Sequence, residues 1–317
     1  MIRPMRCCYH IQSHRSPNQL LRLIRQIKRM SPDSVVHVSH DEKGVRLDTS
    51  ALRGLPDVVV QFHRGGYGDF SHIDRYLAAV DWLVANAVRV DWLINLTGQD
   101  YPLRPLAASE AELVNSGADG FMEYWPAYGP QSHWPARLVR SRYRFRHHRL
   151  AHLPSRAQRL LRPVQALNWI QPLVRVHVAY GLAIGRRVRP AFGTGTELTL
   201  YGGSAYSSLS WPAVAYLRDY LRARPDVVAY FRRTLAPEEV VFQTVLVSSG
   251  RFRLVPDCKR YFDFSQSRLN HPKLLTTEDL PRALASGAHF GRKFDADAHP
   301  EVVDALDAHL LRTAMPA

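Results

Sequence analysis

The chain has 317 residues, of which 46% are hydrophobic and 22% charged, and its formal net charge is +14. This composition is typical of a globular protein and excludes a disordered or fibrous chain, and the length suits one large α/β domain. No apolar run approaches the roughly 18 residues of a membrane-spanning helix, and the N-terminus has no apolar signal-peptide core. We therefore expect a cytoplasmic protein, at most peripheral to the inner face of the membrane.

The first hundred residues alternate strand and helix patterns at short spacing. Buried apolar runs predict strands, and i, i+3, i+4 spacing predicts helices, in the order strand 7–13, helix 18–30, strand 34–40, strand 57–63, helix 70–87, strand 91–98. This order predicts a mainly parallel sheet flanked by helices, with ligands bound at the carboxyl ends of the strands. The loops that follow the four strands are therefore candidate site loops. None of them has the glycine pattern of a dinucleotide-binding or P-loop protein.

Arginine dominates the segment between Glu123 and Glu197, which contains thirteen arginines and no Asp, Glu or Lys. Such a block attracts nucleic acid, anionic lipid or an acidic substrate, and a merely solvated basic face is the alternative. No nucleic-acid-binding motif accompanies the arginines, so no nucleic acid is expected as a partner. Residues 156–173 are amphipathic, which is compatible with a surface helix at a membrane interface.

The second half has a less regular pattern. It predicts, in order, a short strand with a Gly-Gly turn at 197–203, a helix from about 211, a helix over 235–246, an extended stretch at 252–264, a helix at 276–286 and a C-terminal helix at 299–314. The three cysteines, Cys7, Cys8 and Cys258, have no metal-ligand spacing, so buried free thiols are expected. The late Asp295-Ala296-Asp297 is interpreted as the approach to a helix, and no metal is expected there.

Two adjacent carboxylates stand in LAPEEVVFQTVL, residues 235–246. Pro237 suits the first position of a helix, and acids in a first turn are favoured by the helix dipole. On a helix, Glu238 and Glu239 would be about 100° apart, and Glu239 would share a side with Phe242. Either the pair is only a helix start, or Glu239 points into a site while Glu238 caps the helix in solvent.

Two further stretches carry candidate site residues. In GRKFDAD, the basic pair Arg292 and Lys293 could neutralise phosphate oxygens. In INLTGQDYPLRP, Asp100 precedes Tyr-Pro directly after an apolar strand, which predicts a structured loop at the edge of the sheet.

Taken together, INLTGQDYPLRP, YGGSAYSSL, LAPEEVVFQTVL and SGAHFGRKFD resemble the core-2/I-branching β-1,6-N-acetylglucosaminyltransferases, a family that includes the peptide O-xylosyltransferases. YGDFSHI, residues 67–73, resembles a further motif of this family, and the resemblance covers nearly the whole chain. It implies a GT-A-type fold, a UDP-sugar donor, and an inverting reaction that needs neither a metal nor another cofactor.

The resemblance also implies roles for individual residues. It places the general base at Glu239 and the groups that take the charge of the leaving diphosphate at Arg292 and Lys293. The remaining assignments are Asp41, Tyr67 and Gly68 on the donor side, and Glu123, Phe264 and Tyr206 on the acceptor side.

The chain departs from the family pattern in several positions. Ser39 stands where a nucleoside-contacting aspartate is usual, and Asp41 is the nearest substitute. Tyr67 replaces a tryptophan, and Ala205 stands where the xylosyltransferases tend to have aspartate, which disfavours a xylosyl donor. The basic residue that precedes the last motif has only Lys273 or Arg268 nearby.

The resulting hypothesis is a single glycosyltransferase domain. Residues 1–110 would form the nucleotide-sugar-binding half, 120–196 an arginine-rich insertion, and 197–317 the acceptor and catalytic half. The donor would be a UDP-sugar (GlcNAc favoured, xylose second), and the acceptor a hydroxyl of a glycan, a lipid-linked glycan or a protein, with an anionic acceptor in view of the arginines. The alternative is a non-catalytic protein that binds polyanions or a membrane surface on a degenerate transferase fold, which the arginine block and Ser39 favour.

Overall fold

A seven-stranded sheet forms the centre of the computed structural model, which describes residues 5–151, 154–170, 172–178, 180–193, 195–265 and 271–314. Its strands are, in spatial order, β13 (Leu254–Val255), β6 (Gly120–Met122), β12 (Ser207–Ser210), β4 (Trp92–Thr97), β1 (Cys7–Ser13), β2 (Val35–Asp41) and β3 (Val58–His63). The first four strands of the chain run parallel, and β12 is antiparallel to both of its neighbours. The expected mainly parallel, mixed sheet of an α/β fold is confirmed.

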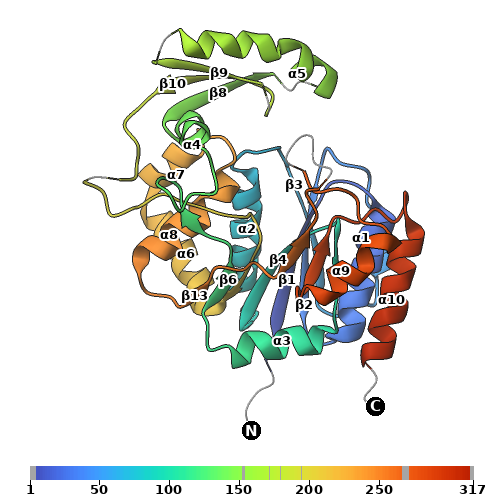
Figure 1. Ribbon diagram of the computed structural model, residues 1–317. Helices are drawn as coiled ribbons and strands as arrows, with labels where there is room; N and C mark the ends of the chain where they lie inside the picture. Colours follow the sequence, from blue (N-terminus) through green and yellow to red (C-terminus); the bar gives the residue numbers. More distant parts are fainter. Residues whose placement is uncertain are drawn as a thin grey trace.

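Helices cover both faces of this sheet (Figure 1). They are α1 (Pro17–Met30), α2 (Ser71–Ala85), α3 (Leu106–Asn115), α6 (Trp211–Ala223), α7 (Pro225–Phe231), α8 (Val241–Ser249), α9 (Leu280–Ala285) and α10 (Pro300–Ala314), with the short 3₁₀ turns η1 (Thr49–Leu52) and η4 (Thr277–Asp279). Alternate residues of β1 enter different cores: Cys7 packs with α1 and α10, and Cys8 with α2, α6 and α8. This alternation is the two-residue period of a strand buried on both sides. Cys7, Cys8 and Cys258 are buried free thiols, as expected.

A second, smaller sheet brings distant parts of the chain together. Strand β15 (Phe290–Arg292) pairs in parallel with β14 (Arg260–Phe262) and antiparallel with β5 (Asp100–Pro102). The sequence predicted only a loop at 98–105, but part of it is β5, and the pairing places Asp100 opposite Arg292. A two-stranded ladder, β7 (Trp125–Pro126) with β11 (Tyr201–Gly202), lies elsewhere in the fold.

The arginine-rich segment builds a separate layer that projects beyond the main sheet (Figure 1). After α4 (Ala136–Tyr143), the strands β8 (Phe145–Ala151), β9 (Val174–His177) and β10 (Leu182–Arg187) form an antiparallel sheet in the order β8-β10-β9, over which lie the helix α5 (Ser155–Leu161) and the 3₁₀ helix η2 (Arg162–Trp169). We call β8, α5, η2, β9 and β10 the cap. The predicted helical pattern at 156–173 is confirmed as far as Trp169, whereas the cap sheet was not predicted.

The turn that carries the paired glutamates differs from the prediction. Pro237–Glu239 is an isolated 3₁₀ turn, η3, and α8 begins only at Val241. The expected continuous helix over 235–246 is therefore wrong. Tertiary hydrogen bonds explain the break: the Ala236 N–H donates to the Gly68 carbonyl (3.0 Å), and the Gly203 N–H donates to the Glu239 carbonyl (2.9 Å). Val240, at φ −138°, leaves the helical region between the two elements.

Across the described helices, no span combines the length and apolar character needed to cross a membrane.

Candidate active site

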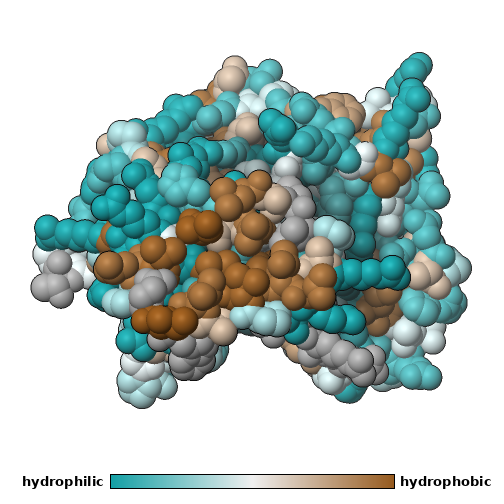
Figure 2. Space-filling model, turned by 90° about the horizontal axis from the view of Figure 1, so that it is seen from above, coloured by the Kyte–Doolittle hydropathy of each residue, from teal (hydrophilic) through white to brown (hydrophobic). Residues whose placement is uncertain are grey.

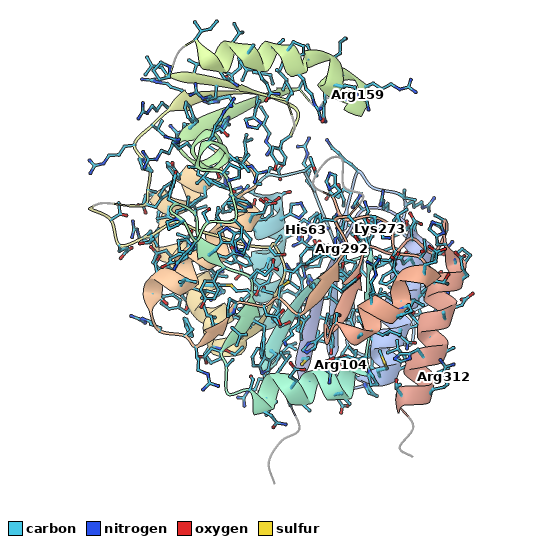
Figure 3. The ribbon with its side chains drawn as sticks, viewed as in Figure 1. His63, Arg104, Arg159, Lys273, Arg292 and Arg312 are labelled. Carbon is cyan, nitrogen blue, oxygen red and sulfur yellow. The ribbon has the colours of Figure 1, made fainter. Side chains whose placement is uncertain are left out.

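The predicted site residues gather largely where β1 to β4 end, beneath the cap. The loop after β1 carries Arg15, β2 ends at Asp41, Tyr67 and Gly68 follow β3, and Asp100 follows β4. The cap is tied to this edge because Arg149 of β8 donates to the carbonyls of Tyr67 (2.7 Å) and Gly68. Figure 3 shows His63, Arg292 and Lys273 at the end of the main sheet that faces the cap, with Arg104 and Arg312 at the opposite end. The carboxyl ends of the strands are thus the floor of the candidate site.

Glu239 is held by an arginine of the arginine-rich segment. Nη1 of Arg142, on α4, lies 2.7 Å from Oε2 of Glu239, and Nη2 donates to the Tyr180 hydroxyl at 2.5 Å. The Arg142 side chain is 9% exposed and that of Glu239 is 33% exposed. Burial raises the pKa of Glu239, and the positive charge of Arg142 opposes this rise. The carboxylate is thus oriented through one oxygen and remains partly open to an incoming group.

Glu238 has a different environment. Its Oε2 is buried and has no hydrogen-bond partner among the described residues. Burial, followed by the negative charge of Glu239, raises the pKa of Glu238 to about 8. The prediction that Glu238 caps a helix in solvent is wrong, because η3 is not continuous with α8 and places this carboxyl inside the fold. The two neighbouring acids therefore have different surroundings: Glu238 has a carboxyl oxygen without a hydrogen-bond partner among the described residues, and Glu239 is paired with the cation of Arg142.

Tyr67 and Gly68 connect the glutamate turn to the cap. Gly68 has φ +58°, and a Cβ on it would come 2.3 Å from the ring of Tyr180. The Tyr67 ring lies 5.5 Å from that of Tyr180, and its hydroxyl forms a 2.9 Å hydrogen bond with Nε2 of His271. Burial and the charges of both glutamates raise the pKa of Tyr67. The structure therefore places these two donor-side candidates beside Glu239.

Asp100 fixes the position of Arg292. The fully buried carboxylate accepts from Arg292 Nη1 (3.0 Å) and from the Thr97 N–H (2.7 Å), and Arg292 also donates to the Thr97 hydroxyl. The Arg292 guanidinium stacks over Tyr206, 5.1 Å from its ring centroid. Tyr206 is therefore placed against a donor-side candidate.

An aromatic row continues from Tyr206. Its ring lies 5.5 Å from Phe262, which lies 5.9 Å from Phe264, and Phe264 is 53% exposed. The row leads from the buried arginine to the surface, so a ligand could stack on its exposed end.

Near Arg292 lie cations that form no ion pair with a described residue. Lys293 forms no ion pair with a described residue, and burial together with the charges of Arg15 and Arg292 lowers its pKa. Nε of Arg15 is buried and has no hydrogen-bond partner among the described residues. Burial and the charges of Lys293 and Arg292 also lower the pKa of His271. Mutually repelling cations held together in this way favour an anionic ligand, because its charge relieves their repulsion.

Other basic residues nearby are already neutralised. Nζ of Lys273 lies 2.8 Å from Asp279 and 3.5 Å from Asp263. Arg268, the other basic residue considered from the sequence, lies outside the described residues. Unlike Lys273, Arg15 and Lys293 thus form no ion pair with a residue that the structure describes.

Asp41 ends β2 and receives the backbone N–H groups of Lys43 and Gly65, both at 3.0 Å. Burial raises its pKa, but these two hydrogen bonds hold it below the usual value. Ser39, by contrast, is buried, and its hydroxyl lies 2.8 Å from Nδ1 of His63 and accepts from Arg75. Ser39 is thus occupied inside the sheet, and Asp41 is the carboxylate that reaches the edge.

Glu123 lies at the end of β6, half-buried, and burial and the charge of Asp257 raise its pKa. Gly203 separates it from the glutamate turn: a Cβ on Gly203 would lie 2.0 Å from the Glu123 carbonyl oxygen, and its N–H donates to the Glu239 carbonyl. The backbones of Glu123 and Glu239 are therefore neighbours through a single glycine.

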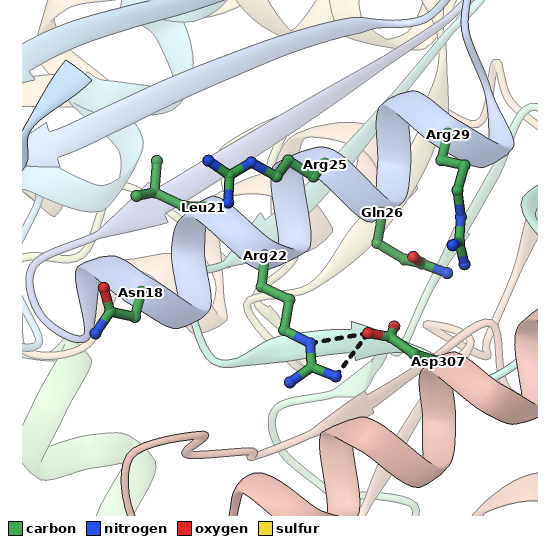
Figure 4. Close-up of a pocket in the computed structure, with 7 residues that line it drawn as sticks. All are labelled: Asn18, Leu21, Arg22, Arg25, Gln26, Arg29 and Asp307. Atoms are coloured by element: carbon green, nitrogen blue, oxygen red, sulfur yellow. Dashed lines mark hydrogen bonds and ion pairs between the residues drawn. The ribbon is translucent and has the colours of Figure 1, made fainter. Parts of the chain in front are cut away.

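No group of three or more His, Cys, Asp or Glu side chains suited to a metal occurs in the part of the chain that the structure describes. Oδ1 of Asp295 accepts from the Asp297 N–H at 3.2 Å, as in a local turn. A surface hollow between α1 and α10 is spanned by the Arg22–Asp307 ion pair and holds none of the predicted site residues (Figure 4).

The chain is similar in part to plant glycosyltransferases. Beta-glucuronosyltransferase GlcAT14B of Arabidopsis thaliana is 32% identical over 119 residues, which are 37% of this chain and 27% of that protein. Beta-glucuronosyltransferase GlcAT14A of the same plant is 31% identical over 119 residues, 26% of its length. The match thus spans about a quarter of each relative. No protein-family model matches the chain. These similarities support a relationship to glycosyltransferases in general, and not to the acetylglucosaminyltransferases in particular.

Several residues of the site were not singled out from the sequence. Arg15 lies in a loop that was marked as a candidate site loop, so its charge was the available signal. Arg142 was expected, together with Arg140 and Arg144, to contact an anionic acceptor, and no pattern marked it as a partner of Glu239; nothing local marks Tyr180 or His271. Only the folded chain brings Arg142 to Glu239, 97 residues away.

Proposed function

We propose that this protein is an inverting glycosyltransferase that moves a sugar from a UDP-sugar to a hydroxyl of an acceptor. The proposal rests on one observation: the same edge of the sheet carries both a candidate general base and a group of cations. Glu239 offers a partly exposed carboxylate, and Arg15 and Lys293 offer cations that form no ion pair with a residue in the described part of the chain. The Tyr67–His271 hydrogen bond links the two groups of residues. The similarity to glucuronosyltransferases supports a sugar-transfer reaction.

Glu239 is the proposed general base. Its carboxylate takes the proton of the acceptor hydroxyl while that oxygen attacks C1 of the donor sugar from the side opposite the diphosphate. A bond forms between the acceptor oxygen and C1, the bond from C1 to the diphosphate oxygen breaks, and UDP leaves with the electron pair. Arg142 holds the carboxylate in place and favours its ionised form.

Arg292, Lys293 and Arg15 are proposed to stabilise the negative charge that develops on the leaving diphosphate. Asp100 and Thr97 hold Arg292 in a fixed orientation, so little reorganisation is needed when the charge appears. Because these cations supply the charge that a divalent ion otherwise provides, we propose a metal-independent reaction.

The donor and acceptor are proposed only as classes. The resemblance to the core-2/I-branching family favours UDP-GlcNAc, with UDP-xylose second, and the similarity to the two plant glucuronosyltransferases adds UDP-glucuronate. Glu123 and the exposed Phe264 are proposed as acceptor contacts, because sugars stack on aromatic rings and hydrogen-bond to carboxylates. A glycan, a lipid-linked glycan or a protein hydroxyl would satisfy these contacts.

A donor screen tests the proposal. UDP release from UDP-GlcNAc, UDP-xylose and UDP-glucuronate should identify one preferred donor, and activity should persist in EDTA. A strict requirement for Mn²⁺ would overturn the metal-independent reaction. UDP should raise the melting temperature more than ADP, and Arg15→Ala or Lys293→Ala should abolish that shift, whereas Arg312→Ala at the far end of the sheet should retain it. Absence of any stabilisation by UDP would favour the alternative of a non-catalytic polyanion-binding protein.

A further inference from the structure

The cap carries an unusual concentration of exposed apolar side chains. Of the fifteen large hydrophobic side chains exposed in the described chain, eight lie between residues 150 and 184. Figure 2, which views the molecule from the side of the cap, shows a hydrophobic cluster on this face. Five of these residues lie on α5, on η2 or shortly after η2, and we call them the outer face: Leu160, Val164, Leu167, Ile170 and Leu173. Leu160 and Ile170 are 80% and 79% exposed. Single exposed apolar residues are ordinary, but a group of them on consecutive elements marks a binding surface.

The polarity of η2 is reversed relative to an ordinary surface helix. Val164 and Leu167 of η2 and Ile170, which directly follows it, recur every three residues, the spacing of one side of a 3₁₀ helix, and all three are exposed. Asn168 instead faces the sheet, where its amide donates to the Val176 carbonyl (2.8 Å) and accepts from the Val176 N–H (2.7 Å). Asn168 thus covers the edge strand β9 and fixes η2 with its apolar side outward. This arrangement leaves apolar area in contact with water, which contributes nothing to the stability of the protein.

Basic side chains share the cap with this apolar face, and Arg156, Arg159 and Arg162 lie on the same elements, α5 and η2. Six arginines of the cap are exposed and form no ion pair with a described residue: Arg146, Arg156, Arg159, Arg162, Arg186 and Arg187. No acidic residue occurs anywhere between Glu123 and Glu197, so nothing in the segment itself neutralises them. Exposed aliphatic side chains together with exposed arginines on α5 and η2 match the interface of an anionic lipid bilayer.

We propose that the cap docks on a membrane surface rich in anionic lipid, with the outer face entering the headgroup and acyl boundary and the arginines binding lipid phosphates. The exposed large hydrophobic side chains in the described part of the cap are all aliphatic. Nucleic acid bases and sugars are held on aromatic or hydrogen-bonding surfaces, whereas acyl chains need only apolar area. The inference does not depend on the sugar-transfer reaction, because lipid binding is measured without turnover.

Vesicle flotation tests the proposal on the full chain. The protein should float with phosphatidylcholine vesicles that contain about 30 mol% phosphatidylglycerol, and it should stay in solution with pure phosphatidylcholine. Arg159→Ala should lower the partition coefficient about fivefold, and Leu160→Ser with Ile170→Ser at least about tenfold. The matched controls lie outside the cap. Arg312→Ala, at the opposite end of the molecule, is the control for the loss of a charge. Val114→Ser on α3 with Leu311→Ser on α10 is the control for the loss of exposed apolar area. The controls should bind as the unchanged protein does.

Three outcomes would overturn the proposal. One is failure of the unchanged protein to float with anionic vesicles. Another is binding that Leu160→Ser with Ile170→Ser leaves intact, since this would mean a purely electrostatic polyanion surface. The third is a concentration-dependent dimer in sedimentation velocity that the same two substitutions convert to a monomer, together with no vesicle binding, since the outer face would then be an interface between two copies. Circular dichroism and melting temperature of each variant exclude unfolding as the cause.

Discussion

Replacement of Arg142 by methionine tests how this arginine affects the pKa of Glu239, the candidate base. The change removes the 2.7 Å ion pair with Glu239 and the hydrogen bond to Tyr180, while it keeps most of the side-chain volume. For two unit charges about 4 Å apart, an effective dielectric constant near 20 gives an attraction of about 4 kcal/mol. Because the Glu239 side chain is 33% exposed, screening by solvent reduces the expected effect to about 1–2 kcal/mol.

The loss of a neighbouring positive charge raises the pKa of Glu239 further. The acid limb of the pH profile of kcat/KM should therefore move to higher pH in Arg142→Met. On that limb, the rate should fall about five- to thirtyfold, which is the equivalent of 1–2 kcal/mol in the ionised fraction. At alkaline pH the kcat/KM values of Arg142→Met and of the unchanged protein should converge. Donor consumption, followed as UDP release between pH 5 and 9, is the measurement.

Arg140→Met is the matched control, because Arg140 is on the same helix, is exposed and donates to the carbonyl of Ala136 in its own helix. Its profile should coincide with that of the unchanged protein. A profile of Arg142→Met that also coincides, or an acid limb that moves to lower pH, would refute the account of Glu239 given above.

Three further predictions concern stability. The pKa of Glu238 is raised from the usual 4.5 to about 8, so its contribution to stability is complete below pH 4.5 and is lost as pH rises through 8. The melting temperature of Glu238→Gln should therefore fall less between pH 6 and pH 9 than that of the unchanged protein. Equal falls in the two melting temperatures would contradict the burial of this carboxyl. Gly68→Ala adds a clash with Tyr180 to the cost of φ +58°, whereas Gly54→Ala, at φ +88° with nothing within 4 Å, carries only the backbone cost of about 1 kcal/mol. Gly68→Ala should thus have the lower melting temperature of the two variants. Equal melting temperatures would show that the contact with Tyr180 adds no cost. Asp100→Asn leaves Arg292 without its buried partner and should cost about 3–5 kcal/mol in urea unfolding, whereas Asp304→Asn at a 66% exposed ion pair should cost at most about 1 kcal/mol.

The central sheet could be predicted from the sequence because its strands are apolar runs that alternate with amphipathic helices. β1 is buried along its whole length, and α1 has its buried residues at helical spacing, so local pattern and tertiary burial agree. The cap sheet lacks this agreement. Strand β8 reads FRHHRLA, and only Phe145 and His147 of its seven residues are buried, which leaves no apolar pattern to find.

The candidate site was predictable where its residues follow a strand and unpredictable where they meet across the chain. Asp100 follows β4 and was marked as structural, but its pairing with Arg292 depends on β5 and β15 lying side by side. The separate environments of Glu238 and Glu239 were expected from helical geometry, yet they arise from an isolated turn fixed by Gly68 and Gly203. Long-range hydrogen bonds of this kind have no local sequence signature.

The most direct test of the proposed function is the rate of sugar transfer by Glu239→Gln. Glutamine keeps a carbonyl oxygen that accepts from Arg142 but cannot take a proton, so the fold and the stabilisation by UDP should persist. We predict a loss of about 10²–10⁴-fold in turnover, with a far smaller loss for Glu238→Gln. Undiminished transfer by Glu239→Gln, or equal losses from the two variants, would contradict the assignment of Glu239 as the general base.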